Sequence, residues 1–137
     1  MTALMGPSGA GKSTLLDVMA GRKTTGEIAG RVLFGGKPPV RSFRRTCGYV
    51  QQHDVLIPTL TVRELFTYTG RLRLPADTCP MDVIEAQSQR IIDDLGLASC
   101  ADTIIGNASM RGVSGGQAKR VNIGIEMVTA PVRWHPT

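Results

Sequence analysis

Aromatic residues are scarce in this chain of 137 residues, at 4 % of its length, and cysteine occurs only three times. Cys47, Cys79 and Cys100 have none of the paired spacings of a metal site, and we expect reduced thiols in a cytosolic protein. No apolar run is long enough to span a membrane, and the N-terminus lacks the basic and apolar regions of a secretory signal. The number and spacing of the cysteines therefore favour reduced thiols over a disulfide scaffold or a metal site.

The net charge of +5 does not identify a partner by itself. The basic residues are scattered in short groups such as Arg22-Lys23, Arg44-Arg45 and Lys119-Arg120. Because so few aromatic side chains accompany them, the chain has no set of stacking platforms for single-stranded nucleic acid. We expect no nucleic-acid partner.

A phosphate-binding loop is present near the N-terminus. The stretch GPSGAGKST matches G-x-x-x-x-G-K-[ST]. It lies between an apolar segment, Thr2 to Met5, which predicts a strand, and a predicted helix. Glycines let backbone N–H groups turn toward a phosphate, Lys12 can reach the β- and γ-phosphates, and the Ser13 hydroxyl suits Mg²⁺. The expected ATP-binding residues are Gly6, Pro7, Ser8, Gly9, Ala10, Gly11, Lys12, Ser13 and Thr14.

A second glycine-rich element lies far downstream, at Ser114-Gly115-Gly116-Gln117. Ser114 is a natural N-cap for a helix that carries Val121, Ile125 and Val128 at helical spacing. A helix start with bare backbone is an anion-binding terminus, but this one lacks the lysine and the magnesium ligand of a complete site. We therefore expect it to supplement a phosphate that is held mainly by another element.

The intervening sequence predicts two short β segments and two helices. The β segments are residues 26–37, with a turn at Gly35-Gly36, and residues 46–50. Thr61 and Glu64 fit a capping box at the start of one helix. The next helix covers about residues 82–95, with Gly96 as the residue that ends it and Leu97 as its hydrophobic partner.

Together these motifs resemble the ATP-binding cassette (ABC) proteins. GPSGAGKST resembles their Walker A loop, and Val113 to Gln117, VSGGQ, resembles their signature motif. The longer stretches GYVQQHDVLIPTLTVRELF and RGVSGGQAKRVNIGIEMVT are similar to the G subfamily of ABC transporters, the white/pleiotropic-drug-resistance type. The resemblance covers nearly the whole chain. It implies an α/β fold of the P-loop NTPase class, with an incomplete parallel sheet and an inserted α-helical signature subdomain.

The resemblance also implies roles for particular residues. In this family the signature motif, here Val113, Ser114, Gly115, Gly116 and Gln117, contacts ATP bound to the Walker A loop of a second cassette. The Q-loop glutamine falls on Gln52 rather than Gln51, with a role at Mg²⁺ beside Ser13. We assign no catalysis to His53 or His135, and we expect Glu126 to be a solvated charge on its helix.

Several family motifs have no counterpart in the sequence. The Walker B aspartate, the catalytic glutamate and the switch histidine are missing, so no catalytic residue is assigned. We expect a fragment that comprises part of the ATP-binding core (1–57), a helical subdomain (58–130) and a non-matching tail (131–137). Alone, it should turn over ATP poorly and should not form a stable, cooperative domain.

The resemblance implies the ATP-binding cassette of an exporter, which binds ATP and Mg²⁺ and, in the complete protein, hydrolyses ATP. Expected partners are a second cassette, identical or different, and a transmembrane domain that would hold the cassette at the cytoplasmic face of a membrane. A soluble ABC-type ATPase of DNA repair or translation remains an alternative, as does a nucleotide-binding product that does not hydrolyse ATP.

Overall fold

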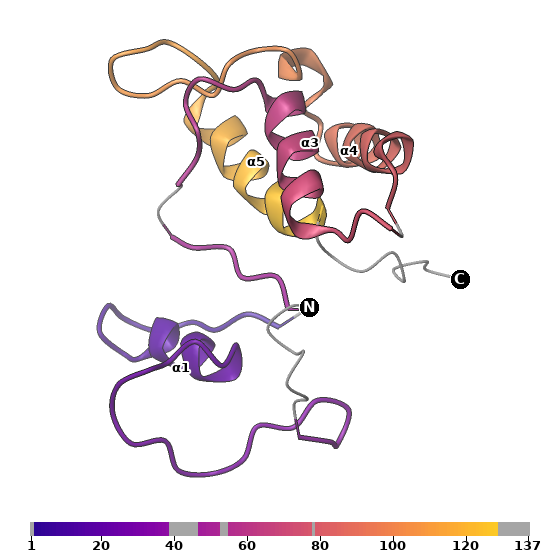
Figure 1. The fold of residues 1–137 in the computed structure, drawn as a ribbon. Coiled ribbons are helices and arrows are strands. Elements are labelled where there is room, and N and C mark those ends of the chain that lie inside the picture. Colours follow the sequence, from indigo (N-terminus) through magenta and orange to yellow (C-terminus); the bar gives the residue numbers. More distant parts are fainter. Residues whose placement is uncertain (1, 39–46, 53–54, 78, 129–137) are drawn as a thin grey trace. The chain divides into compact units, whose positions relative to one another are not determined.

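The computed structural model describes residues 2–38, 47–52, 55–77 and 79–128. The chain divides into two compact units, Met1–Cys47 and Gly48–Thr137, and each unit is considered separately (Figure 1). The tail at residues 131–137 and both histidines lie outside the described residues. The predicted division between residues 57 and 58 stays a prediction.

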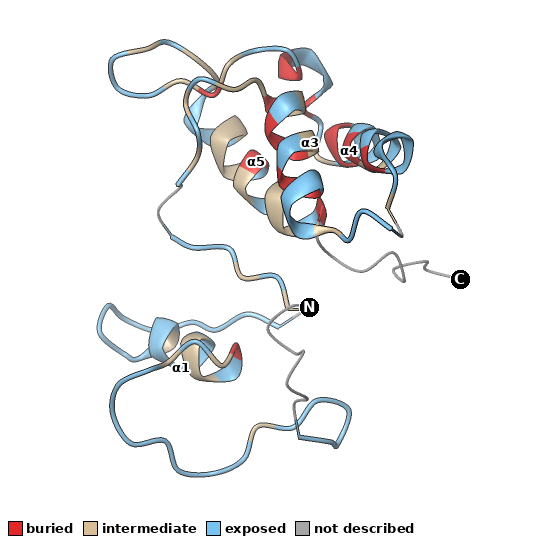
Figure 2. Ribbon diagram, viewed as in Figure 1, coloured by how far each residue is buried: buried red, intermediate tan, exposed pale blue. Residues whose placement is uncertain are grey.

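The first unit contains one helix, α1 (Lys12–Met19), within the residues described. Ala20 is the only buried residue among residues 2–38, and Leu15, Leu16 and Met19 of the helix are all exposed. Figure 2 shows this unit mostly in the colour of exposed residues. The unit therefore has a phosphate loop and a helix but no hydrophobic core.

The predicted strands do not form. Among residues 2–38, 47–52, 55–77 and 79–128 there are only isolated bridges, Phe34 with Lys37 and Thr61 with Ile104. The turn at Gly35-Gly36 is present, with φ of 57° and 79°. Thr2–Met5 and residues 47–50 stay outside regular structure because a parallel strand needs neighbours on both sides, and the described chain supplies none. The parallel sheet of the expected fold class is thus not observed.

The second unit is helical. It comprises α3 (Val62–Arg73), α4 (Met81–Asp94), the short 3₁₀ helix η1 (Ala98–Cys100) and α5 (Gly115–Val128). Each of the three α-helices packs against the other two (Figure 1). Their facing sides form one core that includes Val62, Leu65, Phe66, Ile91, Ile92, Leu97, Val121 and Val128 (Figure 2).

The start of α3 confirms the predicted capping box. The Thr61 hydroxyl accepts a hydrogen bond from the Glu64 backbone N–H at 3.2 Å, and the Glu64 carboxylate accepts one from the Thr61 N–H at 2.9 Å. Two backbone donors at the helix start are thereby satisfied. The cap fixes the position at which α3 begins.

The end of α4 is also as predicted. Gly96 has φ of 61°, its N–H donates to the Asp93 carbonyl at 3.0 Å, and the Leu97 N–H donates to the Ile92 carbonyl at 2.8 Å. This is the Schellman arrangement, and its hydrophobic partner Leu97 is fully buried.

Candidate nucleotide-binding site

The phosphate loop curls around its own lysine. Gly9 and Gly11 have φ of 82° and 85°, in the left-handed region that glycine tolerates best, and Gly11 is the N-cap of α1. An added Cβ at either glycine would meet no atom within 4 Å, so the backbone conformation rather than crowding calls for glycine. The first turn of α1 carries no acidic side chain that would compete with a bound anion.

Lys12 lies over this loop. Its ammonium group donates to the backbone carbonyl of Gly6 at 2.8 Å and to that of Pro7 at 2.7 Å. An ammonium group has three donors, so these two bonds fix the position of the positive charge and leave a donor for a ligand. Ser13 and Thr14, the next two residues of the predicted site, are exposed on the first turn of α1. The loop therefore presents a positioned cation, two hydroxyl groups and a helix N-terminus.

The signature element forms the N-terminus of α5. The Ser114 hydroxyl accepts from the Gln117 N–H at 3.3 Å, and the Gln117 side-chain oxygen accepts from the Ser114 N–H at 2.8 Å. The predicted Ser114 cap is confirmed, and Gln117 completes a capping box that the sequence reasoning missed. The signal was the S-x-x-Q spacing itself.

Gly115 and Gly116 have no reason within the described chain to be glycine. Neither has a positive φ, and an added Cβ at either would meet nothing within 4 Å. The part of the chain that the structure describes offers no hydrogen-bond acceptor to their N–H groups. Bare backbone therefore faces outward at this helix start. Val113 instead points inward and packs against the core.

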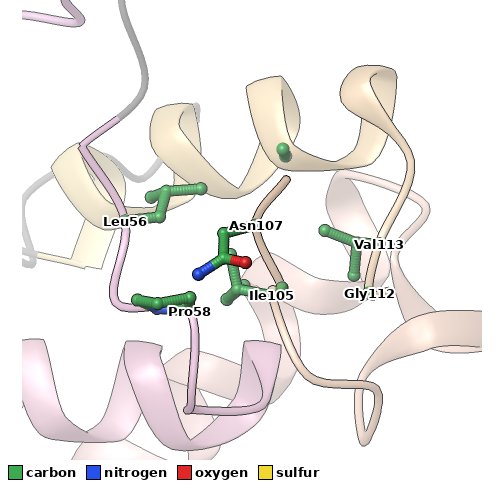
Figure 3. Close-up of a pocket in the computed structure, with 8 residues that line it drawn as sticks. Leu56, Pro58, Ile105, Asn107, Gly112 and Val113 are labelled. Atoms are coloured by element: carbon green, nitrogen blue, oxygen red, sulfur yellow. The ribbon is translucent and has the colours of Figure 1, made fainter. Parts of the chain in front are cut away.

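A pocket lies next to the signature element. It has a volume of about 330 Å³ and is lined by Leu56, Pro58, Ile105, Gly106, Asn107, Gly112, Val113 and Ala118 (Figure 3). The Asn107 side chain accepts from the N–H groups of Ser109 and Met110, both at 2.9 Å, which closes a tight turn beside the pocket. Because its lining has no titratable side chain, we assign no catalytic chemistry to it.

The glutamine segment lies against α5. The Lys119 ammonium donates to the backbone carbonyl of Gln51 at 2.8 Å and to that of Gln52 at 3.0 Å. Both glutamine side chains are exposed. Gln52 and the signature element thus belong to the same helical unit, whereas the phosphate loop belongs to the first unit.

The prediction that Glu126 is a solvated helical charge is wrong. Its side chain is only 20 % exposed, and its carboxylate accepts from the Tyr49 N–H at 3.3 Å and from Arg73 of α3 at 3.3 Å. The approach is possible because Gly48 has no side chain: a Cβ added there would lie 3.3 Å from the Glu126 Cβ. Glu126 is therefore a structural link between α5, α3 and the segment before Gln52.

None of the three cysteines forms a disulfide. All three are free thiols, and burial raises the pKa of Cys100, an effect that the positive charge of Arg120 partly opposes. Within the ranges that the structure describes, no group of three His, Cys, Asp or Glu side chains is placed to hold a metal ion. In those same ranges no helix is long and apolar enough to cross a membrane.

Comparison with known proteins identifies the family. The sequence pattern of the family described as "ABC transporter" matches residues 1–132. The chain is 45 % identical over 131 residues to "ABC transporter G family member 21" of Arabidopsis thaliana, a match that covers 96 % of this chain and 19 % of the relative. It is 50 % identical over 131 residues to "ABC transporter G family member 6" of Dictyostelium discoideum, with 96 % of this chain and 8 % of the relative covered. The chain thus spans less than a quarter of the length of these curated relatives. It belongs to the ABC transporter family and is part of the ATP-binding cassette of the family's G-type transporters.

Proposed function

We propose that the loop Gly6 to Thr14 binds the phosphates of MgATP, and that this binding serves to drive transport by a longer protein. The observation that carries the proposal is the position of Lys12, whose charge is held over the loop by the Gly6 and Pro7 carbonyls. A cation held in this way requires little rearrangement to meet a phosphate, and charge-assisted hydrogen bonds are the stronger kind. The N-terminus of α1 adds backbone N–H donors, which also attract a negatively charged phosphate.

Magnesium fits the donor chemistry of Ser13, in this loop, and of Gln52. The Ser13 hydroxyl and the Gln52 side-chain oxygen are hard ligands of the type that Mg²⁺ takes, and both residues are exposed. Nucleotide phosphates and water would supply further ligands. When bound, Mg²⁺ would neutralise phosphate charge during hydrolysis.

The signature element completes the proposed site from a second cassette. Gly115 and Gly116 are open on their outer side, and Ser114 and Gln117 hold the first turn of α5 rigid without covering it. A helix N-terminus of this kind attracts a phosphate group that is bound mainly elsewhere. In the complete protein, two such cassettes would bind two ATP molecules between them, hydrolyse them, and act on a transmembrane domain at the cytoplasmic face of a membrane.

The test of this arrangement is Ser114→Arg in a polypeptide that also contains the remainder of the cassette. We expect ATP binding by its own phosphate loop to be retained and ATP-dependent dimerisation to be lost, because the larger side chain fills the space over the glycines. Ser109→Arg, on an exposed turn of the same unit, is the matched control and should still dimerise. Size-exclusion chromatography with and without ATP gives the readout. If the Ser114 variant dimerises as the control does, the signature element does not act across an interface.

A further inference from the structure

The segment Gly48 to Gln52 is attached to one face of α5 by two charged side chains. Lys119 donates to the carbonyls of Gln51 and Gln52 at 2.8 and 3.0 Å, and Glu126 accepts from the Tyr49 N–H at 3.3 Å. Lys119 and Glu126 are separated by two helical turns, so their side chains leave α5 on the same side. The helix α5 therefore contacts the segment near both ends of the segment.

The chemistry of each contact suits its place. A lysine ammonium has several donors and can serve two neighbouring carbonyls at once, whereas a carboxylate is an acceptor that suits a backbone N–H. Hydrogen bonds to charged groups are stronger than those between neutral groups. Glu126 is additionally paired with Arg73 of α3 at 3.3 Å, which restrains the carboxylate from a second helix.

These contacts replace the sheet pairing that the segment lacks. Residues 47–52 form no strand, and Gln51 and Gln52 are exposed, so apolar burial does not hold that end of the segment in place. Gly48 permits the close approach, since a side chain there would meet the Glu126 Cβ at 3.3 Å. The contacts of Lys119 and Glu126 with the segment are polar and go to its backbone.

We propose that Lys119 and Glu126 are positioning residues that fasten the Gln52 segment to the signature helix. Gln52 and the phosphate-facing Ser114 end of α5 then move as one rigid piece. The inference rests on the proposed function, because it assigns Gln52 and Ser114 to the nucleotide site. It adds that α5 itself, through Lys119 and Glu126, sets the place of Gln52 relative to Ser114.

Hydrogen exchange of the full chain tests the contacts directly. In Glu126→Ala we expect exchange of the Tyr49 amide to rise about five- to tenfold, because its N–H loses the charged acceptor, and in Lys119→Met we expect a rise of the same order, because the segment loses its second charge-assisted contact with α5. The central residues of α3 and α4 should change by less than about twofold, as expected for a local contact. Lys119→Arg retains the charge and donors and should restore the wild-type rate. Arg90→Met and Glu85→Gln, exposed on α4, are the matched controls.

A cross-link provides a measurement that does not depend on exchange rates. Gly48→Cys with Glu126→Cys should form a disulfide under mild oxidation, because the two Cβ atoms would lie close to disulfide range. Cys47→Ser and Cys79→Ser in the same chain remove competing thiols. Val55→Cys with Glu126→Cys, where Val55 is 82 % exposed, is the control that should stay reduced.

The outcomes separate this inference from the proposed function. Unchanged exchange of the Tyr49 amide, free exchange of that amide already in the wild-type chain, an equal rise throughout the helices, or no cross-link would each overturn the inference. Binding of a labelled ATP analogue in the absence of Mg²⁺ should stay within about twofold in every variant, since none alters the phosphate loop. Failure of the wild-type chain to bind the ATP analogue would instead refute the proposed function.

Discussion

At the scale of single residues, glycine serves two opposite purposes in α5. At Gly124 a Cβ would lie 2.4 Å from Cζ of Phe66, a ring that is completely buried, so glycine is needed for close packing of α5 on α3. At Gly116 a Cβ would meet nothing within 4 Å. No described residue of this unit accounts for the second glycine, and the proposed function gives it a purpose, the approach of a phosphate group to the helix start.

Alanine substitution at the two sites should separate these purposes. Gly124→Ala should destabilise the helical unit by about 1–3 kcal/mol, because overpacking outweighs the gain of about 1 kcal/mol in helix propensity. Gly116→Ala should leave stability unchanged or slightly raised. Urea unfolding followed by circular dichroism measures both. Equal stability of the two variants would contradict the packing of α5 on Phe66.

At the scale of elements, the sequence predicted those features that depend on near neighbours. The Thr61–Glu64 box, the Gly96–Leu97 helix end and the Ser114 cap each involve residues within five positions of one another, and all are confirmed. The role of Glu126 was not predictable in this way, because its partners Tyr49 and Arg73 are far away in the sequence. The strands failed for the same physical reason, since sheet pairing depends on distant segments.

The α3 cap offers an energetic test at this scale. Thr61→Ala removes the hydroxyl that accepts from the Glu64 N–H and should lower the free energy of unfolding by about 0.5–2 kcal/mol. Glu64→Gln should cost less, because glutamine also completes a capping box. Chemical denaturation monitored at 222 nm compares the two. A larger loss in the Glu64 variant would show that the carboxylate, rather than the cap, stabilises this helix start.

At the scale of the whole chain, the two units differ in what holds them together. The helical unit has a core contributed by three α-helices, whereas the phosphate-loop unit buries only Ala20 among residues 2–38. The expectation that the chain alone lacks a stable, cooperative fold stays a prediction, and the structure locates the weakness in the first unit. The loop geometry is nonetheless set locally, by glycines and by Lys12.

Limited proteolysis should reveal this difference. We expect trypsin to cut first at Arg22, Lys23 or Arg31, and to leave a fragment that contains α3, α4 and α5, because exposed backbone without a core opens easily. Mass spectrometry of the early products identifies the sites. Initial cleavage inside α3 or α5, at Arg71 or Arg120, would show that the helical unit is not the more stable of the two.

The central claim, that Gly6 to Thr14 binds the phosphates of ATP, is tested most directly by Lys12→Ala in the full chain. Lys37→Ala, an exposed lysine in the same unit, is the matched control. Titration of each protein with a fluorescent ATP analogue and Mg²⁺ gives the affinity. Loss of a charge-assisted contact of about 1.5–3 kcal/mol predicts that the Lys12 variant binds at least about tenfold more weakly, while the Lys37 variant binds as the wild type does. Equal affinity of the Lys12 variant and the wild-type chain would contradict the assignment of this loop as the nucleotide site.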